Sequence, residues 1–254
     1  MLTDTHTHLY SDAFDNDREA MIERAIAAGV ARFFIPAIDS SYTEAMYRLE
    51  KQFPNRMYLM MGLHPTSVKD NFEEELAHVE AEFEKRDFYA VGEIGIDLHW
   101  DTSTLAIQQQ AFKRQIQLAK RKKLPIVIHC RKAFEEIFDV LETEAGDDLF
   151  GIFHCFTGTR EDAERALSYN MKLGIGGVVT FKNGKIDKFL DEVPISEIVL
   201  ETDAPYLAPT PYRGKRNESV YITEVCKKVA AIYNLSEEEV ARITTENSKE
   251  VFGI

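Results

Sequence analysis

The sequence predicts an α/β protein whose 254 residues fold as a single (β/α)8 barrel. The length matches one such barrel better than two average domains. Short apolar runs alternate with segments of helical periodicity along the whole chain, which predicts parallel strands joined by helices. Eight such runs occur with no Gly/Ser-rich linker between them, so we expect one domain over residues 1–254. A doubly wound open sheet is the alternative arrangement.

The expected elements follow from apolar spacing and from the residues that end each helix. The β-branched threonines of residues 2–9 favour a strand there. Residues 15–28 carry apolar side chains at helical spacing and stop at Gly29, while Pro54 and Pro125 close two later helices. The eight expected strands cover residues 2–9, 32–38, 57–62, 89–94, 126–129, 151–155, 171–176 and 197–202. The expected helices cover residues 15–28, 42–53, 72–85, 105–122, 133–144, 160–169, 186–192, 218–233 and 237–247.

Composition and charge exclude several classes of protein. Hydrophobic residues make up 44% of the chain and charged residues 29%, as in ordinary globular proteins. The formal net charge of −13 argues against a protein that grips duplex nucleic acid through a broad basic surface. No apolar run is long enough to span a bilayer, and the N-terminus lacks the layout of a signal peptide. Three cysteines without a CxxC pair suit a reducing compartment, so we expect a cytoplasmic protein.

Histidine and carboxylate side chains gather where the expected strands end. The six residues at these ends are His6, His8, Glu93, His129, His154 and Asp203. Because the catalytic residues of such barrels lie at the carboxyl ends of the strands, we expect these side chains to meet on one face. Four imidazoles and two carboxylates are enough to hold two divalent metal ions bridged by a carboxylate and a water. Without a metal, so many buried polar groups would be costly, so the sequence predicts a two-metal centre.

The residues that follow the strands supply candidate substrate contacts. His64 and His99 follow strands three and four, while Arg131 and Arg216 belong to a set of cations after strands five to eight that suits phosphate oxygens. Trp100, Tyr206 and Tyr212 also lie just past strand ends and are able to stack on bases. The basic run 120–123 ends a helix that leads into strand five, so we place it on the opposite face, away from substrate.

Two cysteines are expected to pack rather than to bind metal. Cys130 and Cys155 each follow a histidine directly, so on a strand their side chains point away from whatever that histidine faces. Free cysteine is commonly a buried packing residue.

Six segments of the chain resemble one known family. The segments are Asp4–His8, Gly62–Pro65, Val91–Asp97, His154–Gly158, Glu201–Leu207 and Lys215–Glu218. Together they are similar to those of TatD-type metal-dependent deoxyribonucleases in the amidohydrolase superfamily, and the resemblance runs from residue 3 to the final helix. It implies that one metal is held by His6, His8 and Asp203 and the other by His129 and His154, with Glu93 as the bridge. It also implies that Asp203 takes a proton from a metal-activated water.

The leading hypothesis is hydrolysis of a DNA phosphodiester, from a single-stranded or frayed end. The acidic net charge and the scattered cations fit an enzyme that grips a few nucleotides. The same two-metal centre would also activate water for an amide or ester, including an aminoacyl ester on transfer RNA. A binding protein that has lost catalysis would be expected to lack a ligand, and none is missing. Four imidazoles favour Zn, Mn, Co or Ni over Mg, whereas the family resemblance implies Mg, so the sequence leaves the identity of the metal open.

Overall fold

All eight expected strands are present in the computed structural model, which describes residues 1–254. They are β1 Leu2–Asp4, β2 Val30–Ile35, β3 Met57–Leu59, β4 Val91–Asp97, β5 Ile126–Arg131, β6 Gly151–Phe153, β7 Met171–Ile175 and β8 Ile198–Leu200. Strands β1 to β3 form one parallel sheet and β4 to β8 another, each in chain order. A parallel bridge between Met61 and Val91 joins the two sheets on one side. On the other side the Thr5 amide donates to the Leu200 carbonyl at 3.1 Å, so the strands form the predicted (β/α)8 barrel.

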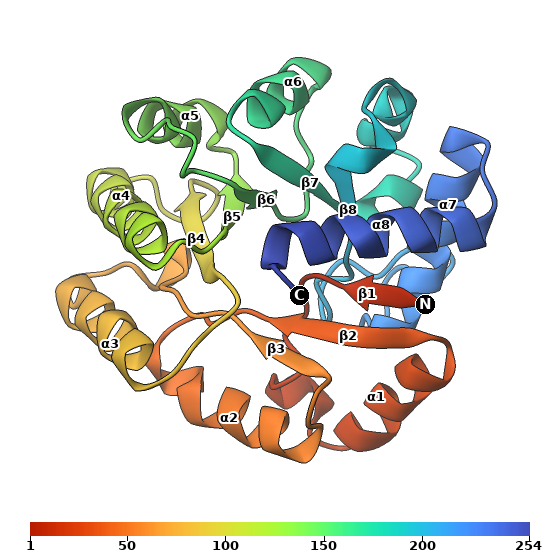
Figure 1. Cartoon of the computed structure of the whole chain (residues 1–254), viewed down its shortest axis with the longest axis horizontal. Helices are drawn as coiled ribbons and strands as arrows, with labels where there is room; N and C mark the ends of the chain where they lie inside the picture. The colour runs from red at the N-terminus through yellow and green to blue at the C-terminus, as the bar shows by residue number, and fades with distance from the viewer.

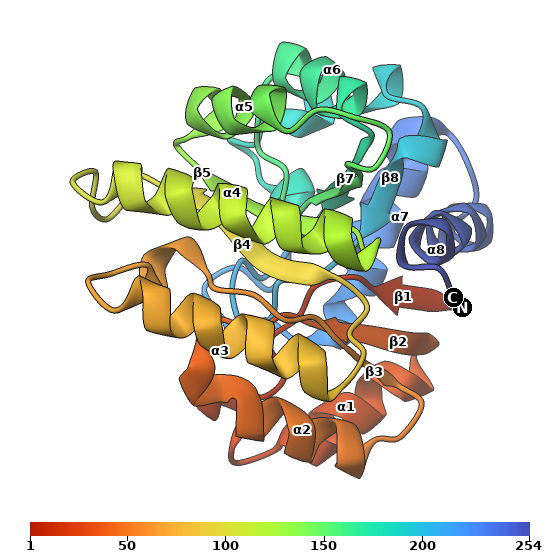
Figure 2. The same cartoon turned by 60° about the vertical axis from the view of Figure 1, so that its left-hand side comes forward.

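Eight α-helices surround the ring of strands (Figure 1). They are α1 Arg18–Ala27, α2 Thr43–Gln52, α3 Phe72–Lys85, α4 Leu105–Lys122, α5 Phe134–Thr143, α6 Arg160–Ser168, α7 Ile222–Tyr233 and α8 Glu237–Phe252. Figure 2 shows α3 and α4 running side by side outside β4, and the two chain termini meeting beside β1. Thr159 caps α6 with a reciprocal bond to Asp162, which satisfies two backbone amides at the start of this helix.

The structure corrects several expected boundaries. Strand β1 ends at Asp4 rather than at residue 9, so His6 and His8 lie in the segment that follows the strand. Strand β4 continues to Asp97, because residues 95–97 pair with β5, and Glu93 therefore lies within the strand. The expected helix 186–192 is two 3-10 turns, Ile186–Lys188 and Leu190–Glu192. A third 3-10 turn, Ser219–Tyr221, replaces the start of the expected helix 218–233.

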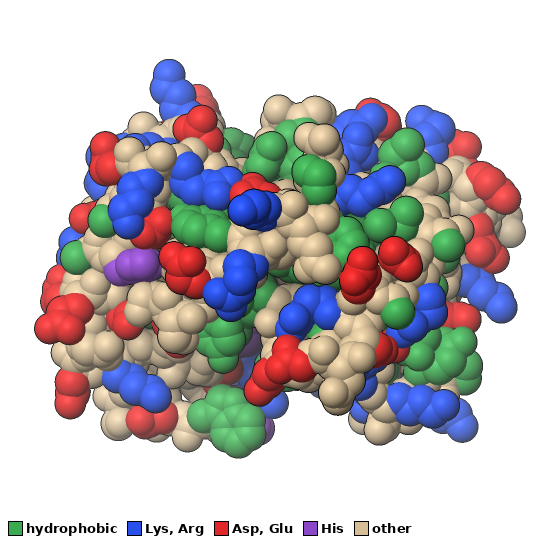
Figure 3. Space-filling view, turned by 90° about the horizontal axis from the view of Figure 1, so that it is seen from below, with side chains coloured by type: hydrophobic (Ala, Val, Ile, Leu, Met, Phe, Trp, Pro, Cys, Tyr) green, Lys and Arg blue, Asp and Glu red, His purple; other side chains and the backbone are tan.

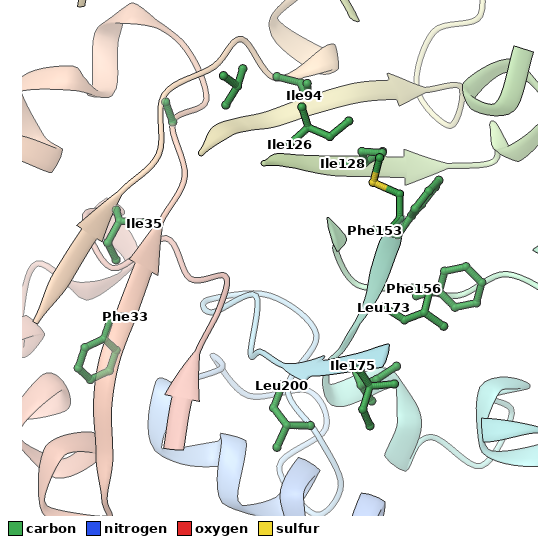
Figure 4. Packing of buried hydrophobic residues seen from close by; sticks show 14 of the residues in the cluster. Phe33, Ile35, Ile94, Ile126, Ile128, Phe153, Phe156, Leu173, Ile175 and Leu200 are labelled. Atoms are coloured by element: carbon green, nitrogen blue, oxygen red, sulfur yellow. The ribbon is translucent and has the colours of Figure 1, made fainter. Parts of the chain in front are cut away.

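The larger part of the core lies between the strands and the surrounding helices. Phe33, Ile94 and Leu200 come from three different strands, and none exposes more than 1% of its surface. Figure 4 shows the side chains of Ile175 and Leu200 pointing away from the centre of the ring. Burial of such a side chain stabilises the fold by about 1.5–3 kcal/mol, so this layer holds the helices in place around the strands.

A second, smaller apolar cluster fills the end of the barrel where the strands begin. It consists of Phe34, Met60, Ala90, Val127, Ile152, Val199, Val251 and Phe252. The last two residues belong to α8, whose end therefore closes the barrel. The ring of Phe252 stacks on that of Phe34 with centroids 3.7 Å apart. These contacts explain why α8 runs five residues beyond its expected end at 247, up to Gly253, which takes the left-handed conformation at φ 67°.

Charges of both signs are interspersed over the surface. On the face in Figure 3, acidic and basic side chains alternate without one continuous basic patch. The basic run at the end of α4 pairs locally: Lys120 lies 3.0 Å from Asp148, and Lys122 lies 2.8 Å from Glu84. None of the helices combines the length and the apolar character that crossing a bilayer requires.

Candidate metal centre

The segment after β1 is fixed against the segment after β8. The buried carboxylate of Asp4 accepts hydrogen bonds from the amide and the hydroxyl of Thr202, at 2.9 and 2.7 Å. The Asp203 amide donates to the His6 carbonyl at 2.9 Å, and the His8 amide donates to the Ala204 carbonyl at 2.8 Å. These bonds bring side chains about 200 residues apart in the sequence onto one end of the barrel interior.

Three of the predicted ligands converge on one point. The Nε2 atoms of His6 and His8 lie 3.3 Å apart, and His8 Nε2 lies 3.5 Å from a carboxylate oxygen of Asp203. His6 Nε2 is also 3.0 Å from Glu93 Oε2. The side chains of His6 and Glu93 are almost completely buried, whereas Asp203 keeps 13% of its side chain exposed toward the open end.

The other carboxylate oxygen of Glu93 faces a second group of imidazoles. Its Oε1 lies 2.7 Å from His129 Nδ1, 3.1 Å from His154 Nε2 and 3.2 Å from His64 Nε2. The pairing register of β4 with β5 shifts across Glu93, so this residue is free of the regular ladder. Glu93 therefore stands between two groups of imidazoles, one at each oxygen.

Outer hydrogen bonds hold three of these imidazoles in orientation. Tyr10 contacts His8 Nδ1 at 2.8 Å and donates its hydroxyl proton to the Pro36 carbonyl. Asp97 lies 2.9 Å from His129 Nε2. Glu201 lies 3.2 Å from His154 Nδ1 and also accepts from the Cys155 amide at 2.6 Å. Such partners fix which imidazole nitrogen faces inward, as is typical of metal-ligating histidines.

Burial and neighbouring charges shift the pKa of several of these groups. Burial opposes charge on Glu93, but the imidazoles of His64, His154 and His6 outweigh burial and hold the pKa of this carboxyl well below its usual value. Burial lowers the pKa of His6 and of His64, which favours neutral imidazoles with free lone pairs. Burial acts against the charge on Asp203 as well, but a hydrogen bond with His8 and nearby imidazoles lower its pKa. Burial opposes charge on His129 and His154 too, but the carboxylates of Asp97 and Glu93 around His129, and of Glu93 and Glu201 around His154, outweigh burial and raise the pKa of both imidazoles. These two imidazoles therefore have to release a proton when a divalent ion binds.

The donor set fits divalent metal ions. Imidazole nitrogens at 2.0–2.1 Å from one tetrahedral ion lie about 3.3 Å apart, which is the separation of the two Nε2 atoms of His6 and His8. Three groups of donor atoms are close enough to share an ion: His6 with His8 and Asp203, His6 with Glu93 and His154, and His64 with Glu93 and His129. Glu93 belongs to two of these groups, and each of its carboxylate oxygens faces a different set of imidazoles.

A cavity of about 640 Å³ opens above this cluster, at the end of the barrel where the strands finish. Of the predicted substrate contacts, His64 and Arg131 line the cavity. His99 does not line it, although its neighbour Trp100 does. Arg216 lies outside it as well, because its guanidinium is bound by Asp17 at 2.6 and 2.8 Å and by Glu218 at 2.9 Å. This placement argues against Arg216 as a substrate contact.

Two cysteines and two partners of the imidazoles lie where the sequence did not predict them in full. Cys130 packs against the main core, as expected, and also touches the cavity. Cys155 lines the cavity as well, and its φ of 45° lies outside the strand geometry on which the expectation rested. All three cysteines are unpaired. The roles of Tyr10 and Asp97 as imidazole partners were missed, and their spacing of two to four residues from a ligand is the signal that was available.

Fold and site together define a barrel hydrolase that depends on metal. A sequence model of the family described as "TatD related DNase" matches residues 3–253. The chain belongs to this family, as its segments suggested. It is 42% identical over 256 residues to the "Uncharacterized metal-dependent hydrolase YabD" of Bacillus subtilis, with each chain fully covered.

Two further relatives match almost the whole chain. The chain is 30% identical over 253 residues to the "3'-5' ssDNA/RNA exonuclease TatD" of a Rahnella species, with 97% of this chain and 96% of the relative covered. The crystal structure of YjjV, a TatD homologue from Escherichia coli, superposes with a TM-score of 0.93 at 28% identity, covering 100% of this chain and 98% of that one. The predicted fold class is thereby confirmed.

Proposed function

We propose that this metal-dependent hydrolase is a deoxyribonuclease that cleaves phosphodiester bonds in single-stranded DNA or at frayed ends. The observation that carries the proposal is the meeting of the six predicted ligands, joined by His64, beneath a cavity lined by Arg131. The family and the relative named as a single-strand exonuclease support nucleic acid as the substrate. We also propose that residues 1–254 act as one catalytic domain and that the cytoplasm, which suits three unpaired cysteines, is its compartment.

The proposed centre holds two divalent ions, Mg, Mn or Zn. His6, His8 and Asp203 would hold one ion, and His129 and His154 would hold the other, with Glu93 shared between them, since one of its oxygens lies 3.0 Å from His6 and the other 2.7 and 3.1 Å from His129 and His154. Bound there, such ions supply Lewis acidity, which acidifies a water molecule and offsets charge on the phosphate.

The chain's own side chains perform the remaining steps. Asp203, ionised and partly open to the cavity, accepts the proton that the attacking water releases. Arg131 is exposed, makes no ion pair within the chain, and reaches the phosphate oxygens by charge-assisted hydrogen bonds. His64 stands beside Glu93 and His129 at the cavity wall, where it contacts either substrate or the second ion.

The proposal is tested by turnover of metal-stripped protein that is reloaded with Mg, Mn or Zn. The substrates are an end-labelled single-stranded DNA and, separately, an aminoacyl ester on transfer RNA. Asp203→Asn is the test variant, and Asp101→Asn, on an exposed loop after β4, is the matched control. We expect metal-dependent shortening of the DNA that Asp203→Asn abolishes and Asp101→Asn leaves intact. Cleavage of the ester alone would contradict the nuclease assignment and retain the metal centre.

A further inference from the structure

Trp100 occupies an unusual position for an indole. It is the only tryptophan of the chain, lies in the loop after β4, and exposes 73% of its surface. It also lines the cavity above the metal centre. Burial of such a large ring would stabilise the fold, so an exposed indole at a cavity mouth indicates a surface that binds something apolar and flat.

Arg131 lies beside this indole. Its guanidinium carbon is 5.4 Å from the centroid of the Trp100 ring. Arg131 is the last residue of β5 and lies two positions after the candidate ligand His129. Other arginines of this face are already engaged, since Arg216 is bound by Asp17 and Arg213 lies over the Phe181 ring at 3.7 Å while donating to the Ala208 carbonyl. Arg131 makes no ion pair within the chain, so its charge is available to an anion next to the indole.

The opposite side of the cavity carries a second apolar edge. Tyr206 exposes 53% of its surface and Leu207 exposes 37%, and both follow β8, four strands away from β4 in the ring of eight. The Tyr206 ring lies 5.9 Å from the ring of His8. A chain of nucleotides that crosses the cavity would therefore pass Tyr206 on one side of the metal centre and Trp100 on the other.

We infer that Trp100 and Arg131 form a nucleobase subsite, in which a base of a single-stranded nucleic acid stacks on the indole while its phosphate bonds to the guanidinium. The inference rests on the proposed function and names a residue that selects the substrate. Unpaired bases offer an open face for stacking, whereas the bases of a duplex do not. Trp100 does not touch the reacting atoms, so it determines affinity and the choice of substrate, and the chemistry belongs to the metal centre.

The lone tryptophan allows a direct binding test. With excitation at 295 nm, the intrinsic fluorescence of the metal-loaded protein reports on Trp100 alone. We expect saturable quenching by 2'-deoxyadenosine 5'-monophosphate, and none by 2-deoxyribose 5-phosphate, which carries the same phosphate and sugar without the base. Equal responses to the two compounds, or no response to either, would overturn the subsite. Because neither probe contains a phosphodiester bond, this result is independent of nuclease activity.

Steady-state kinetics provide the second test. Trp100→Ala should raise KM for a single-stranded oligonucleotide about 10-fold to 100-fold with kcat nearly unchanged, and Trp100→Phe should retain most of the affinity. An oligomer with tetrahydrofuran in place of each nucleoside should respond to neither change. An unchanged KM in Trp100→Ala, or an equal loss on both oligomers, would overturn the subsite. If the wild-type chain cleaves no DNA while the nucleotide still quenches the indole, the proposed function fails and the subsite stands.

Discussion

The two ends of the barrel interior are built from the same strands but hold opposite chemistry. Where the strands begin, Phe34, Val127 and Phe252 belong to an apolar plug that α8 completes. Where they finish, His6 and Glu93 are as deeply buried, yet they are polar and converge on each other. Burial alone therefore does not define the core. At one end of the barrel, burial of apolar side chains stabilises the fold. At the other end, burial surrounds a cluster of polar side chains that suits cations.

The largest expected effect comes from the centre of the polar end. Glu93→Gln removes the negative charge that two groups of imidazoles share. Because loss of a few kcal/mol of transition-state stabilisation reduces a rate about 10³-fold, we expect metal-dependent DNA hydrolysis to fall by at least this factor. End-labelled DNA and a quenched time course measure it. If Glu93→Gln keeps more than a tenth of the wild-type rate, the Glu93 carboxylate is not essential to the metal centre.

A substitution at the apolar end should lower the stability of the fold instead of the rate of hydrolysis. Phe252→Ala deletes a ring that stacks on Phe34 at 3.7 Å, and we expect the free energy of unfolding in urea to fall by about 3–5 kcal/mol. Ile254→Ala, two residues further on and 38% exposed, is the control and should change it by less than about 0.5 kcal/mol. The folded Phe252→Ala protein should bind metal as the wild type does. Equal losses in both variants would mean that α8 does not close the barrel.

Sequence patterns predicted the strands and the six candidate ligands, but not the contacts between residues far apart in the sequence. The six predicted ligands each follow closely on an apolar run or stand in one, so the strand pattern alone placed them on one face. His64 was predicted as a substrate contact, and its Nε2 also lies 3.2 Å from Glu93, so this residue belongs to one of the groups of donor atoms as well. The ion pair of Arg216 with Asp17, 199 residues away, is beyond the reach of local patterns, and the role of Arg216 as a substrate contact stays a prediction.

An intermediate effect is expected from a residue that supports a ligand. Asp97→Asn weakens the hold on His129 without removing a donor to the metal. We expect affinity for Mn or Zn, measured by competition with a chelator, to fall about 10-fold to 100-fold. Asp101→Asn, four residues along and exposed, should leave the affinity unchanged. An Asp97→Asn variant with wild-type affinity would show that this hydrogen bond does not position the imidazole.

The smallest effect on stability is expected for Asp17, at the rim of the polar end. Hydrogen bonds from Arg216 and Arg24 outweigh partial burial and lower the pKa of Asp17 from 3.8 to about 2. A carboxyl with a depressed folded pKa stabilises the fold fully above its unfolded pKa and loses this contribution as the pH falls from about 4 toward 2. Asp17→Asn should therefore cost up to about 1 kcal/mol at pH 6, given the solvent exposure of the pair, and only a small fraction of that at pH 2. Urea unfolding at both pH values measures the difference, and a pH-independent difference would contradict the ion pair.

We propose that the polar end of the barrel holds two metal ions that share Glu93. Equilibrium dialysis with Mn²⁺, followed by electron paramagnetic resonance of the bound ions, tests it most directly. We predict two Mn²⁺ per chain with a spectrum broadened by coupling between neighbouring ions, and loss of that coupling in Glu93→Gln. A single Mn²⁺ per chain, or two ions with the spectra of isolated centres, would contradict it.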